Sequence, residues 1–231
     1  MPRNNTPNSI KNEITALIYK LTHIGLAVDQ NLPSIIRKGR NIDIIWDGQT
    51  HLSVALKKNS DYNKIYEEIF KERNYSLRFN DGAIIQISYR FNGHNLISHR
   101  LVYLPNPLYH DSNEYNDIEI VCEEEGGDDE DFFTPSNQSK IIMPIRFDYT
   151  TSGSQDIKHP MSHLHLGVFQ DCRIPLNTPI TPNIFIDFIL RNFYSDVFYK
   201  NFLPSDFKFS KDFPVTITSG EEKIIHLNFK I

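Results

Sequence analysis

Residues 83–104 read AIIQISYRFNGHNLISHRLVYL, and this stretch decides the fold class. Apolar and polar side chains alternate in it on both sides of the tripeptide Asn92-Gly93-His94. Asn and Gly tolerate the positive φ angles of a tight turn, and alternation with a period of two is typical of a strand with one buried face. The stretch therefore predicts a β-hairpin whose strands cover residues 83–91 and 95–104.

Further strands and three helices are predicted on both sides of this hairpin. Thr6-Pro7 is an N-cap followed by a first-turn proline, and the apolar residues after it recur at helical spacing as far as Gly25. The same kind of pattern predicts helices over residues 61–73 and 181–201. Alternating patterns predict strands over residues 42–46, 52–56, 141–150, 162–169 and 223–231. The first two are joined at Asp47-Gly48 as a hairpin, and a short helix is the alternative for residues 52–56.

The order of these elements predicts an α+β fold. The strands of the meander follow one another without intervening helices, which favours an antiparallel sheet over a parallel one. We expect one α+β domain over residues 1–231. Its antiparallel meander would carry the N-terminal helices and one long C-terminal helix on one face. A chain of 231 residues is long enough to bury one large core.

Charge is distributed unevenly along the chain. The formal net charge is -5, but residues 101–139 contain eleven acidic residues and no Lys or Arg. The other 192 positions hold 24 basic and 18 acidic residues, a net charge of +6. We expect residues 105–140 to form an acidic surface loop or a disordered excursion from the domain. The weakly basic remainder keeps nucleic acid open as a partner.

Several protein classes lose support from motifs that the sequence lacks. No apolar run reaches the ~20 residues of a membrane-spanning helix, and the first residues lack the apolar core of a secretory signal. We therefore expect a cytoplasmic protein without a membrane partner. The sequence also lacks a Walker phosphate loop, a dinucleotide-binding glycine fingerprint, an H-E-x-x-H zinc motif and a G-x-S-x-G nucleophile elbow.

Three of the nine histidines gather in the stretch HPMSHLH, residues 159–165. On a strand, His163 and His165 point to the same face about 7 Å apart. On the preceding predicted strand, Arg146 and Asp148 occupy the polar positions of an alternating pattern. If these two strands are neighbours in the sheet, Arg146 and Asp148 lie beside the two histidines.

The hairpin and the segment after the histidines supply further candidates. His99 and Tyr103 share one face of the strand 95–104, and Arg100 lies on the opposite face. We expect His99 and Tyr103 to approach the surface that carries the histidines, with His99 as a further catalytic residue. Candidates for substrate binding are Arg100, Tyr103, Arg173 and His159.

These residue types suit cleavage of an RNA phosphodiester without a cofactor. One imidazole of the pair His163 and His165 would accept the ribose 2′-hydroxyl proton, and the other would protonate the leaving oxygen. Arg146 would stabilise the charge that develops on the phosphate, and Asp148 would orient a histidine. Two alternatives stay open: a structural or partner-binding polar surface, and a divalent metal site formed by His159, His163 and His165 with a carboxylate such as Asp148.

Four segments carry a resemblance to a known family. Their sequences are RFDY at 146–149, HPMSHLHLG at 159–167, CRIP at 172–175 and FIDFILRNFY at 185–194. In these segments the chain resembles the bacterial family catalogued as domain of unknown function 2290. A shorter likeness, over residues 146–165, is to toxins of the TumE type, in which an R-[YF]-D strand precedes a histidine-rich strand.

The family resemblance implies a genomic context beside helicases in bacterial anti-phage defence loci. A helicase encoded nearby is therefore an expected partner. We expect a defence component of one of two kinds: a nuclease-like toxin that cleaves RNA at His163 and His165, or a non-enzymatic subunit that docks on the helicase and regulates it. In the second kind, the acidic segment 111–131 would contact the partner or cover the nucleic-acid groove. A metal-binding enzyme is a third hypothesis.

Overall fold

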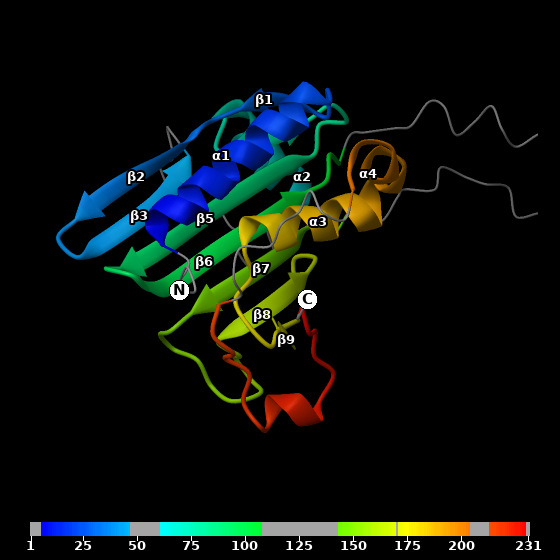
Figure 1. Cartoon of the computed structure of the whole chain (residues 1–231). Coiled ribbons are helices and arrows are strands. Elements are labelled where there is room, and N and C mark those ends of the chain that lie inside the picture. Colours follow the sequence, from blue (N-terminus) through cyan, green and yellow to red (C-terminus); the bar gives the residue numbers. More distant parts are fainter. Residues whose placement is uncertain (1–5, 47–60, 108–142, 170, 204–212, 230–231) are drawn as a thin grey trace, which may run out of the picture.

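The computed structural model of the protein describes residues 6–46, 61–107, 143–169, 171–203 and 213–229 (Figure 1). Nine strands in these ranges form one antiparallel sheet, and β5 pairs with both β3 and β4 along one edge. The fold is α+β, as predicted. The strands are β1 (Ala27–Gln30), β2 (Pro33–Lys38), β3 (Asn41–Trp46), β4 (Leu77–Phe79), β5 (Ile84–Asn92), β6 (Asn95–Leu104), β7 (Ile145–Thr150), β8 (Ser162–Leu166) and β9 (Ile174–Pro175).

The predicted hairpin forms the centre of the sheet. β5 and β6 pair from Ile84 opposite Leu104 to Asn92 opposite Asn95. Gly93 adopts a φ of +62° in the turn between them, which explains the Asn-Gly sequence. β7 pairs with the free edge of β6 and β8 pairs with β7, so the meander continues from β5 to β8.

Helices α1 (Pro7–His23) and α3 (Pro182–Phe193) cover one face of this sheet (Figure 1). α1 begins after the N-cap Thr6, as predicted, and α3 begins after the N-cap Thr181. Alternate side chains of the central strands complete the core under these helices. Phe147 of β7 packs edge-on against three rings, those of Phe185, Phe188 and Phe229.

Helix α2 (Tyr62–Lys71) lies on the opposite face, so the prediction that all helices share one face is wrong. Its apolar side packs on strand residues that alternate with those of the main core. This second cluster covers only the end of the sheet where β5 begins and β6 ends. It consists of Ile65, Tyr66, Ile69, Tyr75, Ile84, Val102 and Leu104.

The rest of the face that carries α2 is polar, and we call it the open face. Its side chains come from positions that alternate with the core residues of β3 and of β5 to β8. They are Asp43, Ser88, Arg90, Ser98, Arg100, Arg146, Asp148, Thr150, His163 and His165.

The C-terminal part differs from the prediction in two places. The expected long helix over residues 181–201 is divided into α3 and α4 (Ser195–Asn201). Tyr194 leaves the helical conformation there, with φ -137° and ψ 44°, and its hydroxyl donates a hydrogen bond to Asp81 at 2.7 Å. In place of the expected strand 223–231, the described residues form a 3-10 turn at Glu221–Lys223 and a single bridge between Leu227 and Leu176.

Other predictions are met in part or lie outside the described residues. The strand predicted at 42–46 is β3, but its partners in the described ranges are β2 and β5. Its predicted partner at 52–56 falls outside these ranges, as does most of the acidic segment 105–140. The short strands β1, β2 and β4 are not predicted by the alternation pattern. None of the helices in the described ranges is long and apolar enough to cross a lipid bilayer.

Candidate functional site

β7 and β8 are direct neighbours, and their pairing assembles the candidate site. Asp148 lies opposite His163 and Arg146 lies opposite His165. On the other side of β7, Arg100 of β6 lies opposite Asp148. Residues directly opposite each other in antiparallel strands share a face, so these five side chains meet on the open face. The predicted convergence of Arg146, Asp148, His163 and His165 is present in the structure.

Asp148 is the centre of the ion pairs in the site. Its Oδ1 accepts a hydrogen bond from Arg100 Nε at 3.0 Å, and its Oδ2 lies 2.8 Å from Arg146 Nε. Burial raises the pKa of Asp148, but the charges of Arg100 and Arg146 outweigh it and hold the pKa below its usual value. The distance from Oδ2 to His165 Nε2 is 3.7 Å, too long for a hydrogen bond. Asp148 therefore orients two arginines and not a histidine.

The hydrogen bonds of His163 and His165 fix the positions of their protons. His163 Nδ1 lies 2.7 Å from the carbonyl oxygen of Pro160, which only accepts, so Nδ1 carries the hydrogen. The neutral ring then has a bare Nε2, and His165 Nε2 donates to it at 2.9 Å. This leaves His165 Nδ1 as a bare acceptor. It is buried and has no hydrogen-bond partner in the described part of the chain.

Both of these histidines are neutral at pH 7. Burial lowers the pKa of His163 to about 4 and outweighs the opposing charge of Asp148. Burial and the charge of Arg146 lower the pKa of His165 to about 3. A neutral imidazole accepts a proton, and it becomes a general acid at this pH only when a nearby anion raises its pKa.

Arg173 and His159 complete the surroundings of the histidine pair. Ile174 of β9 lies opposite Leu164, which places Arg173 next to His165. His159 precedes β8, and its ring centre is 5.1 Å from that of His163. Its Nδ1 donates to a carbonyl oxygen at 2.9 Å, so the neutral ring has its acceptor at Nε2. We define the Arg-His cluster as Arg100, Arg146, Asp148, His163, His165 and Arg173.

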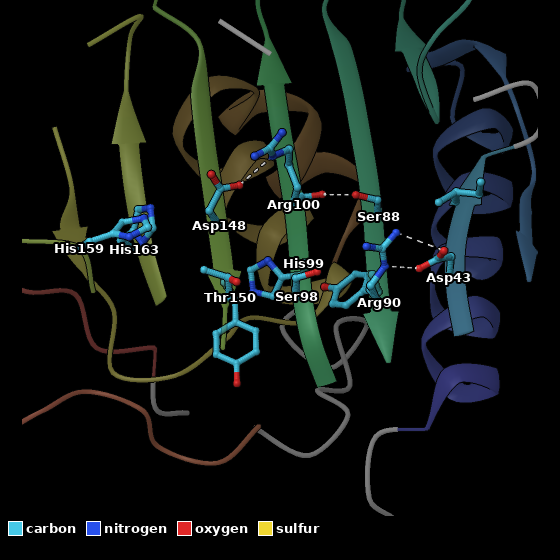
Figure 2. Close-up of a pocket in the computed structure, with 13 residues that line it drawn as sticks. Asp43, Ser88, Arg90, Ser98, His99, Arg100, Asp148, Thr150, His159 and His163 are labelled. Carbon is cyan, nitrogen blue, oxygen red and sulfur yellow. Dashed lines mark hydrogen bonds and ion pairs between the residues drawn. The ribbon is translucent and has the colours of Figure 1, made fainter. Parts of the chain in front are cut away.

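A hollow of about 360 Å³ opens on the open face beside the Arg-His cluster (Figure 2). Arg100, His163 and His159 line one end of it. At the other end, Arg90 donates to both carboxylate oxygens of Asp43, at 2.6 and 3.3 Å. The lining residues come from β3, β5, β6, β7 and β8 and from the loop before β8. Neighbouring strands are about 4.8 Å apart, so the hollow extends over about 19 Å of the sheet.

His99 and Tyr103 are not brought to the Arg-His cluster, which corrects the prediction for both. His99 is among the residues that line the hollow, but His99 and Tyr103 occupy positions of β6 that alternate with Arg100, so both side chains project toward the covered face. His99 Nε2 accepts a hydrogen bond from the Ile180 N–H at 3.3 Å. The Tyr103 hydroxyl lies 3.3 Å from that of Tyr194. Strand pairing puts Arg100, the residue after His99, opposite Asp148 and on the open face.

The residues that could bind a metal ion differ from the predicted set, and the charge around them is unfavourable for a cation. Ligand atoms of Asp148, His163 and His165 lie within 4.8 Å of one another, whereas His159 is not part of this group. Both oxygens of Asp148 already face arginines, and Arg173 adds a third guanidinium nearby. A divalent cation would be repelled by these charges. The donor set therefore fits an anion better than a metal ion.

Sequence reasoning misses the opposite end of the hollow, formed by Asp43 and Arg90. A signal for Arg90 exists, because Ser88 and Arg90 are the polar positions in the predicted strand 83–91. The pairing of Ser88 with Arg100 puts these positions on the open face. Asp43 is likewise a polar position in the predicted strand 42–46, but no local pattern pairs that strand with β5, since their pairing joins segments 47 residues apart.

Comparison with known proteins gives one family and no individual relative. No curated protein and no solved structure matches the chain. A family model described as an uncharacterized conserved protein (DUF2290) matches residues 26–229. The matched range includes the whole sheet, the Arg-His cluster and the hollow. The chain therefore belongs to the DUF2290 family, as the resemblance in its RFDY and HPMSHLHLG segments predicted.

Proposed function

We propose that the protein binds RNA in the hollow of its open face and cleaves it without a metal, as a component of a bacterial anti-phage defence system that works with a helicase. One observation carries the RNA proposal: Arg100, His159 and His163 meet at one end of the hollow. A guanidinium group binds phosphate oxygens through its planar fork, and imidazoles transfer protons near neutral pH. The defence context and the helicase partner rest on the family resemblance.

The proposed reaction is an internal transesterification that needs no water molecule. Arg100 binds the phosphodiester, and His159 Nε2 accepts the proton of the ribose 2′-hydroxyl. The 2′ oxygen forms a bond to phosphorus while the bond from phosphorus to the 5′ oxygen breaks. The leaving 5′ oxygen takes a proton from His163. The products are a 2′,3′-cyclic phosphate and a 5′-hydroxyl end, and solvent restores the two histidines.

This assignment changes the roles that the sequence suggests. The side chain of His165 is only 4% exposed, and it occupies His163 Nε2 by donating to it. His159 is half-exposed and keeps its acceptor on Nε2, so it suits the base better than either member of the pair. His163 becomes the acid once the negative charge of the bound phosphate raises its pKa. Uptake of a proton from solvent at His163 Nε2 ends the hydrogen bond from His165 Nε2, because two N–H groups then face each other, and it frees His163 Nε2–H for the leaving oxygen. His165 positions His163 only before this proton is taken up.

The experiment compares cleavage of single-stranded RNA with that of DNA and of 2′-O-methyl RNA, in the presence of EDTA. We expect cleavage of RNA only, with cyclic phosphate ends. His159→Ala and His163→Gln should each reduce the rate by about 10²- to 10⁴-fold, the usual contribution of a general acid or base. His23→Ala is the matched control, because His23 is an exposed histidine at the end of α1.

Three outcomes would overturn the proposal. Cleavage that persists in a His159→Ala/His163→Gln double variant would come from another source. Cleavage that EDTA abolishes would support the metal hypothesis instead. RNA binding without any cleavage, both alone and with the helicase encoded nearby, would support the non-enzymatic alternative of a helicase-docking subunit.

A further inference from the structure

The Arg-His cluster continues beyond the hollow toward α2. Arg146, His165 and Arg173 belong to the cluster but are not among the residues that line the hollow. Arg146 lies opposite Val102, which packs in the apolar cluster under α2. The cluster is therefore larger than the proposed cleavage site requires, and its second half has no role in the proposed reaction.

This second half contains buried polar atoms without partners. Nε of Arg146, Nε of Arg173 and Nδ1 of His165 are buried, and none has a hydrogen-bond partner in the described part of the chain. Arg146 Nε is close to Asp148, but its N–H does not point along a hydrogen bond. A buried donor or acceptor that makes no hydrogen bond costs about 1–3 kcal/mol. Three such atoms beside one another indicate a ligand that bonds to them.

The charges of the cluster indicate an anion with more than one negative charge. The cluster holds three guanidinium groups and one carboxylate, that of Asp148, which pairs with Arg100 and Arg146. Asp171 is 3.7 Å from Arg173, but its side chain is 97% exposed and neutralises little. A phosphodiester carries a single negative charge, whereas a phosphate monoester carries about 1.5 to 2 negative charges at pH 7. The charge of the monoester therefore matches the excess positive charge of the cluster better than the charge of the diester does.

The bare acceptor on His165 also favours a phosphate monoester over a phosphodiester. Arg146 and Arg173 offer only donors, while the neutral His165 offers a lone pair at Nδ1. A phosphate monoester has a second pKa near 6, so its monoanion carries a hydrogen that it can donate to this lone pair, whereas its dianion, which prevails at pH 7, matches the charge of the arginines. A phosphodiester has no such hydrogen. The donor and acceptor pattern is complementary to a monoester and not to a diester.

We propose that Arg146, Arg173 and His165 form a subsite for a phosphate monoester, such as the terminal phosphate of an RNA strand whose next phosphodiester lies in the hollow. The identity of the strand rests on the proposed function. The subsite itself does not, because phosphate binding here requires no cleavage. Free inorganic phosphate has the same chemistry as the terminal phosphate of an RNA strand, and the experiment below distinguishes these two ligands.

The test measures binding of 2′-O-methyl oligoribonucleotides, which cannot be cleaved, by fluorescence anisotropy. The oligonucleotides carry a 5′-phosphate, a 3′-phosphate or only hydroxyl ends. We expect one phosphorylated form to bind about tenfold more tightly than the hydroxyl form. Arg173→Gln should abolish this difference, so that the phosphorylated and hydroxyl forms bind the variant with equal affinity. Inorganic phosphate should compete in the wild type and fail to compete in the variant.

Two further variants separate binding from folding. Arg146→Lys keeps the charge of a buried side chain but loses its fork, so we expect a folded protein with a weaker preference for phosphorylated ends. Arg40→Gln, in the exposed turn between β2 and β3, is the control and should keep the full preference. Thermal melting of each variant shows whether it is folded.

Failure of the subsite and failure of the proposed function give different results. Equal binding of phosphorylated and hydroxyl ends, or a preference that survives Arg173→Gln in folded protein, overturns the subsite even if RNA is cleaved. Binding of inorganic phosphate that depends on Arg173, without binding of any oligonucleotide, supports the subsite for free phosphate. That second result overturns the proposed function.

Discussion

β7 places Phe147 on one face of the sheet and Asp148 on the other, one residue apart. The Phe147 ring packs among other rings under α3, at centroid distances of 5.3 to 6.0 Å. The Asp148 carboxylate is also largely buried, but two guanidinium groups hold it. The same backbone thus supports a core held by packing and a polar cluster held by charge. Burial alone does not distinguish the core of this sheet from its candidate site.

The two faces of the sheet can also be compared through one residue type, because each face buries a histidine. His99 and His163 are 3% and 1% exposed. His99 lies between the rings of Tyr89 and Tyr149 and accepts a backbone hydrogen bond, which is a structural role. Both histidines are among the residues that line the hollow, but His163 lies beside the ion pairs of Asp148 and hydrogen-bonds to His165. The neighbours of a buried histidine, and not its burial, indicate its function.

The largest effect is expected from removing the central side chain of either face. Phe147→Ala leaves a cavity under α3 and should lower the free energy of unfolding by about 3–5 kcal/mol. Asp148→Ala leaves two arginines without their carboxylate and should lower it by about 3–5 kcal/mol as well. Urea denaturation measures both losses.

Salt distinguishes the two causes. About 1 M sodium chloride shortens the screening length to about 3 Å, so it should recover part of the loss in Asp148→Ala. The same salt should not recover the loss in Phe147→Ala, since a cavity carries no charge. A loss below about 1 kcal/mol in Asp148→Ala would show that the carboxylate does not hold the cluster together.

The next largest effect of a single side chain is expected from the titration of one buried histidine in acid. Burial is the main reason that the pKa of His99, His163 and His165 falls to about 3, 4 and 3. An unfolded histidine has a pKa near 6.5, so protons bind the unfolded chain more readily. The stability from these neutral histidines is complete above about pH 6.5 and decreases as the pH falls toward about 4. Each contributes a slope of about 1.4 kcal/mol per pH unit in this range.

Single variants show how much of this pH dependence of stability comes from the histidine on each face of the sheet. His99→Gln and His163→Gln should each reduce the pH dependence of the urea midpoint between about pH 6.5 and pH 4.5 by one such slope. Inorganic phosphate should raise the pKa of His163 on the open face and reduce the slope that His163 contributes, and it should change the slope of His99 less, because the His99 side chain lies on the opposite face. An equal effect of phosphate on both slopes would contradict the assignment of the anion site to the open face. Asp148 titrates below this range and does not interfere.

The sequence predicted the strands of the site well because local alternation defines them. The pairing of β7 with β8 was an explicit condition of the prediction, and the structure meets it. The period of two also separated His99 from Arg100 correctly, but it could not tell which of them faces Asp148. A shift of one residue in the pairing of β6 with β7 would exchange them. That register is decided by long-range contacts, and the prediction for His99 failed for this reason.

The remaining errors also come from contacts between distant segments. The end of α3 depends on the hydrogen bond of Tyr194 to Asp81, 113 residues away. The face chosen by α2 depends on which side of β5 and β6 its apolar stripe meets, which its own periodicity does not encode. The alternation at 223–231 lacks a neighbouring strand in the described residues, and Ile225 is 85% exposed.

The smallest effect is expected at the far end of the hollow. Asp43 and Arg90 form an ion pair on the same open face, but their side chains are 19% and 48% exposed, against 13% each for Asp148 and Arg146. Solvent screens the exposed pair, so Asp43→Asn should lower the free energy of unfolding by less than about 1 kcal/mol. The loss should vanish in high salt. A loss as large as that of Asp148→Ala would mean that charge pairing, and not burial of the pair, determines stability on this face.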